Sequence, residues 1–124
     1  MKLQKTILFL EDEEEFLSTV SSLLRDIGYN VVEVLNAERA LEILEKTAPD
    51  LIIADIKLPG INGFDFFTQV HRIDKYHKIP FIYLTAFNNL QAAMRAKSDG
   101  ATDYITKPFE LEYLITRIRE LLPP

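Results

Sequence analysis

The chain has 124 residues, a formal net charge of −5 and no cysteine. This length suits one compact domain with its own core, so we expect a single domain over residues 1–124. The lack of cysteine excludes disulfides, thiolate metal sites and thiol nucleophiles, and the acidic balance argues against direct binding to nucleic acid or to anionic membranes.

The apolar runs are short. Runs such as Ile7 to Leu10 and Leu51 to Ala54 fall far below the ~20 residues that span a bilayer, and the N-terminus lacks the apolar core of a signal peptide. We therefore expect no membrane segment and a cytoplasmic protein.

Two kinds of segment alternate along the chain. Short runs rich in β-branched or aromatic residues predict strands, and they cover residues 6–10, 31–35, 51–54, 81–84 and 104–105. Apolar residues at helical spacing follow each run, within residues 16–27, 37–44, 64–70, 90–94 and 111–122. Strands that alternate with helices require right-handed crossovers and a parallel sheet covered on both faces. We predict an α/β fold of the doubly wound (βα)₅ type.

Helix boundary signals agree with these segments. Asn36 is placed to cap the second helix, and Gly28 and Gly100 follow the first and fourth.

Polar residues follow four of the predicted strands. Glu11 and Asp12 follow the first, Asp55 the third, Thr85 the fourth and Lys107 the fifth. In an open parallel sheet, ligands bind at the carboxyl ends of the strands, near the point where strand order reverses. Crowded carboxylates repel one another unless a hard divalent cation neutralises them, and oxygen ligands suit Mg²⁺, or Mn²⁺. The sequence predicts an acidic metal site with a hydroxyl and an amine beside it.

These residue types fit phosphoryl transfer. An ionised aspartate such as Asp55 can attack phosphorus and form an acyl phosphate, provided that a metal, an ammonium and a hydroxyl meet the charge on the phosphoryl oxygens. Each residue alone has an ordinary explanation, since acids favour helix N-termini and threonine favours strands. Only the combination, in this order and at matching strand ends, is specific.

The motifs around these residues resemble those of one family. They are Phe9-Leu10-Glu11-Asp12, Ala54-Asp55-Ile56-Lys57-Leu58-Pro59-Gly60 with Asn62-Gly63, Leu84-Thr85-Ala86, and Gly100-Ala101 through Tyr104-Ile105-Thr106-Lys107-Pro108-Phe109. Over essentially its whole length the chain resembles the receiver domains of two-component response regulators, which are CheY-like. The resemblance implies a flavodoxin-like sheet with strand order 2-1-3-4-5, and it places any output domain outside this chain.

The resemblance also assigns roles at the metal site. It makes Asp55 the phosphoacceptor, which would take its phosphoryl group from a histidine kinase or a histidine phosphotransfer protein. Glu11, Asp12, Asp55 and the backbone carbonyl of Lys57 would bind Mg²⁺. Such a domain catalyses only its own phosphorylation and dephosphorylation, so we expect a signalling phosphoacceptor and not a free-turnover enzyme.

A second set of implied roles concerns switching. Lys107 would pair with Asp55 and then with the phosphoryl group, Thr85 would move to hydrogen-bond it, and Tyr104 would turn inward. The face formed by the fourth helix, fifth strand and fifth helix, roughly residues 89–122, would change and control an output partner or domain. The resemblance allows phosphorylation-dependent dimerisation through this face, and it implies a cis peptide bond between Lys107 and Pro108.

Two positions near the site are less standard. Lys57 stands two residues after Asp55, and Phe87 stands two residues after Thr85. Their charge and bulk are expected to alter the rate at which phosphate is lost, and Phe87 in particular could shield the acyl phosphate.

Elsewhere, Phe64, Phe66 and Phe67 are expected in the core. His71 and His77 lack neighbours at ligand spacing and are expected on the surface.

Three other functions remain open at this point. A phosphatase with an aspartate nucleophile would need a second aspartate where Lys57 stands. A nucleotide- or flavin-binding module would need a glycine-rich first turn in place of Glu11 to Glu14, and titration with these ligands would reveal it. A receiver that only binds other proteins would lack part of the predicted site, whereas every position here is filled.

Overall fold

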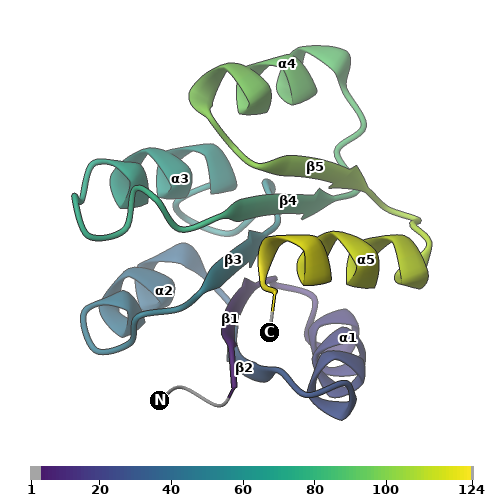
Figure 1. Cartoon of the computed structure of the whole chain (residues 1–124). Helices are drawn as coiled ribbons and strands as arrows, with labels where there is room; N and C mark the ends of the chain where they lie inside the picture. Colours follow the sequence, from purple (N-terminus) through teal and green to yellow (C-terminus); the bar gives the residue numbers. More distant parts are fainter. Residues whose placement is uncertain (1–3, 124) are drawn as a thin grey trace.

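The computed structural model describes residues 4–123, and strands and helices alternate strictly along them (Figure 1). In chain order the elements are β1 (Thr6–Leu10), α1 (Glu14–Asp26), β2 (Asn30–Val34), α2 (Ala37–Leu44), β3 (Leu51–Ala54), α3 (Gly63–His71), β4 (Phe81–Thr85), α4 (Leu90–Asp99), β5 (Asp103–Thr106) and α5 (Leu111–Leu121).

The strands form one five-stranded sheet in the order β2-β1-β3-β4-β5, and every neighbouring pair is parallel. This confirms the predicted (βα)₅ fold and its strand order. The order reverses at β1, which pairs with both β2 and β3. Ligands bind at such a reversal point in open parallel sheets, so the topology directs attention to the residues that follow β1 and β3.

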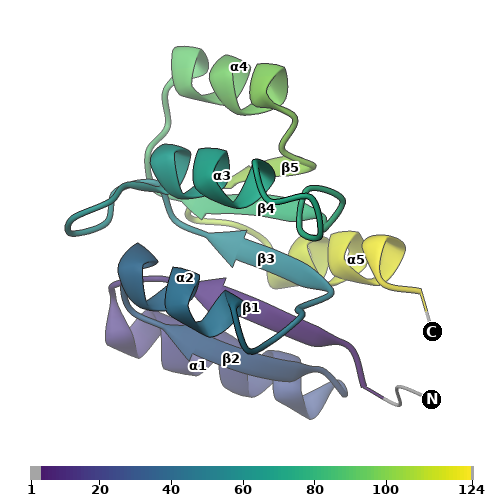
Figure 2. The ribbon, with the colours of Figure 1, turned by 90° about the vertical axis from the view of Figure 1, so that its left-hand side faces the viewer.

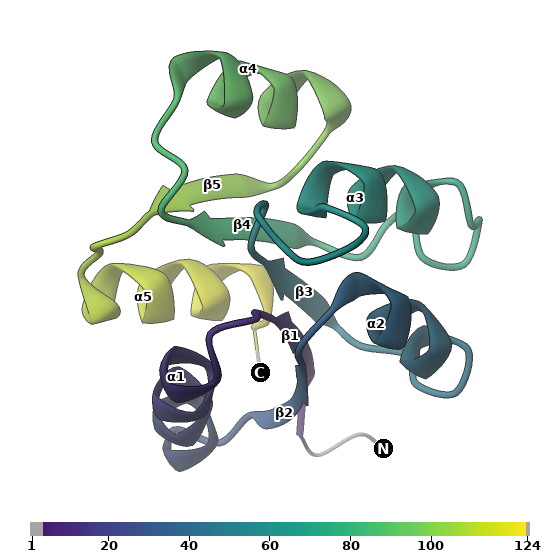
Figure 3. The ribbon, with the colours of Figure 1, turned by 180° about the vertical axis from the view of Figure 1, so that it is seen from behind.

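Helices cover both faces of the sheet, with α1 and α5 on one side and α2 and α3 on the other (Figure 3). Each face has its own buried apolar cluster. One cluster contains Leu17 and Leu24 of α1 and Leu114 and Ile118 of α5. Because both faces are covered, the central strands β1 and β3 are apolar apart from Thr6, and all of their residues are buried.

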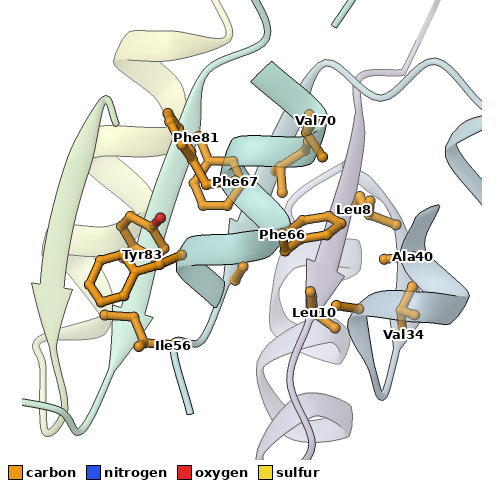
Figure 4. Packing of buried hydrophobic residues seen from close by; sticks show 14 of the residues in the cluster. Leu8, Leu10, Val34, Ala40, Ile56, Phe66, Phe67, Val70, Phe81 and Tyr83 are labelled. Atoms are coloured by element: carbon orange, nitrogen blue, oxygen red, sulfur yellow. The ribbon is translucent and has the colours of Figure 1, made fainter. Parts of the chain in front are cut away.

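The second cluster lies under α2 and α3, and Figure 4 shows its aromatic centre. Phe67 of α3 lies against β4, where its ring meets Phe81 edge to face at a centroid distance of 4.9 Å. Phe66 lies on the side of α3 that faces Leu8 of β1 (Figure 4). Phe64, Phe66 and Phe67 are all buried. The predicted core role of these three residues is confirmed.

Some predicted boundaries shift. The second strand begins at Asn30 and ends at Val34, so Leu35 lies outside it and is exposed.

In α4 the spacing of apolar residues predicted the helix correctly, but it did not predict which side of the helix is buried. Leu90 and Met94 are exposed, whereas the buried residues are Ala92 and Ala96.

Asparagines start three of the helices. The side chain of Asn36 accepts a hydrogen bond from the Arg39 backbone N–H at 2.8 Å, which confirms the predicted cap of α2. Asn62 and Asn89 cap α3 and α4 in the same way.

In residues 4–123, no helix combines the length and the apolar character that a membrane crossing requires.

Candidate functional site at the carboxyl edge of the sheet

The loops that follow β1, β3 and β4 meet at one edge of the sheet, opposite the end of α5 (Figure 2). The hydrogen-bond ladder of the sheet continues one residue into this edge. The N–H of Glu11 donates to the carbonyl of Val34 at 3.0 Å, and that of Asp55 donates to Leu10 at 3.0 Å. The N–H of Lys107 donates to Thr85 at 2.8 Å. The sheet thus fixes the backbone of three predicted site residues.

Three carboxylates converge there. Glu11, Asp12 and Asp55 each offer an oxygen, and these oxygens lie within 4.8 Å of one another. The exposed fraction is 1% for Glu11 and 8% for Asp55, while Asp12 is exposed. Backbone N–H groups hold the two buried side chains, because Glu13 donates to Glu11 Oε2 at 3.0 Å and Ile56 donates to Asp55 Oδ1 at 2.6 Å. The carboxylate cluster is therefore open to solvent on the side of Asp12.

Lys107 lies between the two buried carboxylates. Its Nζ is 2.6 Å from Glu11 Oε1 and 3.4 Å from Asp55 Oδ2. The predicted pairing with Asp55 is present, but the shorter contact is with Glu11, which the sequence did not indicate. The ring of Phe16 lies 4.2 Å from Nζ. This contact was also missed, because Phe16 reads only as an apolar residue of α1.

Burial and charge shift two pKa values in this cluster. Burial raises the pKa of Glu11, and its hydrogen bonds to Lys107 and Glu13 only partly oppose the rise. Burial alone would lower the pKa of Lys107, but the hydrogen bond and charge of Glu11, together with Asp55, outweigh it and raise the pKa. The cluster thus contains three carboxylates, and the one ammonium within it contacts two of them. A set of oxygen donors with excess negative charge fits a hard divalent cation.

Thr85 shares a hollow with Asp55. The hollow has a volume of about 180 Å³, and its lining includes Asp55, Lys57, Thr85 and Phe87. Thr85 is 1% exposed, and its Oγ1 accepts a hydrogen bond from the Phe87 N–H at 3.1 Å. The predicted site threonine therefore lies in the same hollow as Asp55, but its oxygen is bonded to the next loop.

Phe87 connects several of the predicted residues. The hydroxyl of Tyr104 donates to the carbonyl oxygen of Phe87, and burial, together with the charge of Asp55, raises the pKa of Tyr104. The Nζ of Lys57 lies 4.5 Å from the centroid of the Phe87 ring. The sequence singled out Lys57 and Phe87 separately, but no spacing rule indicates that their side chains meet.

The loop after β3 depends on a glycine. The N–H of Gly63 donates to the carbonyl of Ile56 at 2.7 Å. A Cβ atom at Gly63 would lie 2.2 Å from the carbonyl oxygen of Asp55 and 2.7 Å from the Cα of Ile56. Because both of these are backbone atoms, only glycine allows the start of α3 to pack so closely beside Asp55.

The other sequence predictions can be placed as well. The peptide bond between Lys107 and Pro108 is cis, as the resemblance implied. His71 and His77 are exposed, as expected. Within residues 4–123, the carboxylate cluster is the one group of three or more potential metal ligands that lies close together.

The site and the fold together define a class of protein. The model of the response regulator receiver domain family matches residues 7–119. The chain therefore belongs to the response regulator receiver domain family.

Individual relatives agree. The chain is 35% identical over 118 residues to the phosphate regulon transcriptional regulatory protein PhoB of Escherichia coli, and it covers 52% of that protein. It is 33% identical over 116 residues to the DNA-binding dual master transcriptional regulator RpaA of Synechocystis, and covers 48% of it. These matches include 95% and 94% of this chain, which thus spans about half the length of these relatives. A crystal structure of a putative response regulator from Chloroflexus aurantiacus superimposes with a TM-score of 0.90 at 31% identity, covering 98% of this chain and 99% of that one.

Proposed function

We propose that Asp55 accepts a phosphoryl group from a phosphohistidine and that the domain then changes its surface to control an output partner. The observation that carries this proposal is the convergence at Asp55. Its carboxylate lies in the acidic cluster, 3.4 Å from the Lys107 ammonium, and in one hollow with Thr85. A histidine kinase or a histidine phosphotransfer protein is the donor in this proposal.

The chemistry needs little from the protein except positioning and charge. An oxygen of the Asp55 carboxylate forms a bond to phosphorus, and the bond between phosphorus and the donor imidazole nitrogen breaks. The imidazole leaves with the electron pair and takes a proton from solvent. Lys107 and Thr85 would donate to the developing charge on the phosphoryl oxygens.

Glu11, Asp12, Asp55 and the backbone carbonyl of Lys57 would hold Mg²⁺ here. The bound cation would neutralise charge on the phosphoryl oxygens and on the carboxylates. The geometric support is the carboxylate cluster itself, whose three oxygens lie within 4.8 Å of one another.

Switching would begin at Thr85. The Thr85 Oγ1 accepts the Phe87 N–H, so a shift of its hydroxyl toward a phosphoryl group on Asp55 would pull on or break this bond, and the carbonyl of Phe87 is bonded to Tyr104. This loop leads into α4, and Tyr104 lies in β5, so a move of the loop would act on both elements and, in this proposal, on the neighbouring α5. On this proposed output face the exposed apolar residues are Leu90, Met94 and Tyr113, which suits binding of a partner, an output domain or a second copy.

The relatives bear on domain organisation. RpaA is described as DNA-binding and PhoB as a transcriptional regulator, and the chain matches about half of each. We propose that residues 1–124 form one receiver domain. With a net charge of −5, this domain itself is poorly suited to bind DNA, so any such activity would belong to a separate output domain.

The test is the intact mass of the protein after incubation with a small-molecule phosphodonor, with and without Mg²⁺. We expect one phosphoryl addition that requires Mg²⁺ and is absent in Asp55→Asn. Asp74→Asn is the matched control, because Asp74 is exposed and lies away from the cluster. No addition to the wild type with any divalent metal would instead identify a receiver that only binds other proteins.

A further inference from the structure

We propose that His71 and His77 form a second cation site, which binds a divalent transition metal ion such as Zn²⁺ or Cu²⁺. The two histidines lie at the end of α3 and in the loop that follows it. Their ring centroids are 6.2 Å apart, and the ring planes meet at 86°. They are the only histidines of the chain, and the proposed function uses neither of them.

A hydrogen bond prepares His77 to act as a ligand. Its Nδ1 lies 2.6 Å from the backbone carbonyl oxygen of Asp74. A carbonyl oxygen can only accept, so Nδ1 carries the hydrogen atom and the lone pair of the neutral ring is on Nε2. Histidines that bind metals usually donate their other ring N–H to a carbonyl or a carboxylate in this way. The backbone N–H of His77 also donates to Ile73 at 3.1 Å, which holds the residue in its turn.

An aromatic stack holds His71. Its ring lies on that of Phe67, one helical turn earlier, with a centroid distance of 4.8 Å and an angle of 18° between the planes. Phe67 is buried, so the stack fixes the histidine ring against the end of α3. A Cβ atom placed on Gly100 would lie 3.9 Å from His71 Nε2. This nitrogen therefore lies beside the turn between α4 and β5, where Gly100 has no side chain that would block an ion.

One ion can join the two rings. Zinc binds imidazole nitrogen at about 2.0–2.1 Å, so the rings of two ligands of one tetrahedral ion have centroids about 5 Å apart. The observed separation of 6.2 Å would have to close by about 1 Å. Because His77 is exposed, a small rotation of its side chain can supply this change.

The ligand type separates this site from the carboxylate cluster. Imidazole nitrogens suit Zn²⁺, Ni²⁺ and Cu²⁺, whereas carboxylate oxygens suit Mg²⁺. The negative end of the α3 dipole, at His71, also favours a cation. Arg72, Lys75 and Lys78 in the same segment oppose it, and dedicated zinc sites have three or four protein ligands. We therefore expect a weaker site, in which water molecules complete the coordination of the ion.

The two sites lie at opposite edges of the sheet. Helices run back against the strands of a parallel sheet, so α3 ends at the edge where β4 begins (Figure 1). A metal ion bound there would link the loop between α3 and β4 to the last turn of α3. Because the ion would bind the folded state, it should raise the temperature of unfolding.

The test is a titration of the full chain with Cu²⁺, without an affinity tag and with excess Mg²⁺ present to occupy the carboxylate cluster. Electron paramagnetic resonance should show one copper ion per chain with two imidazole nitrogens bound. Calorimetry should give Cu²⁺ and Zn²⁺ affinities that His71→Gln and His77→Gln each lower by about a hundredfold, because the second ligand binds intramolecularly. Lys78→Gln is the matched control, since Lys78 is exposed in the same loop and should leave both bound nitrogens in place.

Three results would overturn the inference. The first is the absence of copper-bound imidazole in the wild type, and the second is two copper ions per chain with one nitrogen each. The third is a copper-dependent dimer in size-exclusion chromatography, since its ligands would come from two molecules. The double variant His71→Gln/His77→Gln measures binding elsewhere on the chain. Thermal unfolding without metal checks the fold of each variant, and if His71→Gln is destabilised through loss of the stack on Phe67, His77→Gln still decides the question.

Discussion

The ammonium of Lys107 lies 2.6 Å from Oε1 of Glu11, a side chain that is 1% exposed. The same ammonium lies 3.4 Å from Oδ2 of Asp55, so one cation forms ion pairs with two buried carboxylates. Because one ammonium offsets the charge of both carboxylates, we expect the stability of the protein to depend on the charges at this site.

Lys107→Ala should destabilise the metal-free protein by about 1–3 kcal/mol, because it leaves two carboxylates crowded without a counter-ion in a partly exposed site. Mg²⁺ should then stabilise the variant more than it stabilises the wild type, since the cation replaces the lost charge. Urea unfolding with and without Mg²⁺ measures both effects. Lys46→Ala, at an exposed position, is the control. An equal gain from Mg²⁺ in both proteins would contradict the prediction.

The raised pKa of Glu11 predicts a pH-dependent contribution to stability. In the pH range between its folded pKa and its ordinary value of 4.5, the folded state takes up a proton that the unfolded state does not. The free energy of unfolding contributed by Glu11 should therefore increase as the pH falls from neutral toward that range. Glu11→Gln cannot take up this proton. The difference in unfolding free energy between wild type and variant, without metal, should shift in favour of the wild type as the pH is lowered, and a constant difference would disprove this.

Gly63→Ala should both destabilise the protein and weaken its binding of Mg²⁺. The new methyl group would meet the backbone of Asp55 and Ile56, and overpacking of this kind costs about 1–3 kcal/mol or more. Gly28→Ala is the comparison. Gly28 has a φ of +108° but no atom within 4 Å of an added Cβ, so it should cost about 1–2 kcal/mol through backbone strain alone. Calorimetric titration should show weaker Mg²⁺ binding only for Gly63→Ala.

Phe66→Ala should lower the free energy of unfolding by about 3–5 kcal/mol, because the ring is 0% exposed and its removal leaves a cavity between α3 and the sheet. Leu90→Ala, by contrast, changes a side chain that is 76% exposed and should alter stability by less than about 0.5 kcal/mol. Denaturant unfolding of both variants tests the pair. A large loss for Leu90→Ala would show that this part of α4 is covered in solution.

The sequence predicted correctly those features whose position is determined by the backbone of the sheet. Strand periodicity located the sheet, and a parallel sheet brings the residues after its strands to one edge, so the gathering of Glu11, Asp55 and Lys107 could be predicted. Which side chains then touch depends on rotamers and on segments far apart in the chain. For that reason the preference of Lys107 for Glu11 and the meeting of Lys57 with Phe87 were not foreseen.

The same reasoning was weaker for α4. Leu90 and Met94 have the spacing of a buried stripe, yet they face solvent, and the smaller Ala92 and Ala96 pack inward. Helical periodicity reports that a helix has an apolar side, but it does not distinguish a side that faces the core from one that is left exposed.

Leu10 pairs with Ala54 in neighbouring parallel strands, so the sheet itself brings the next residues, Glu11 and Asp55, together. This placement depends on the strand register and not on the outer surfaces of the helices between the two strands. The solvent-facing surfaces of α1 and α2 can therefore diverge from one relative to another without displacing the carboxylates. Such a domain can acquire new partners by drift on its helices while its chemistry stays unchanged.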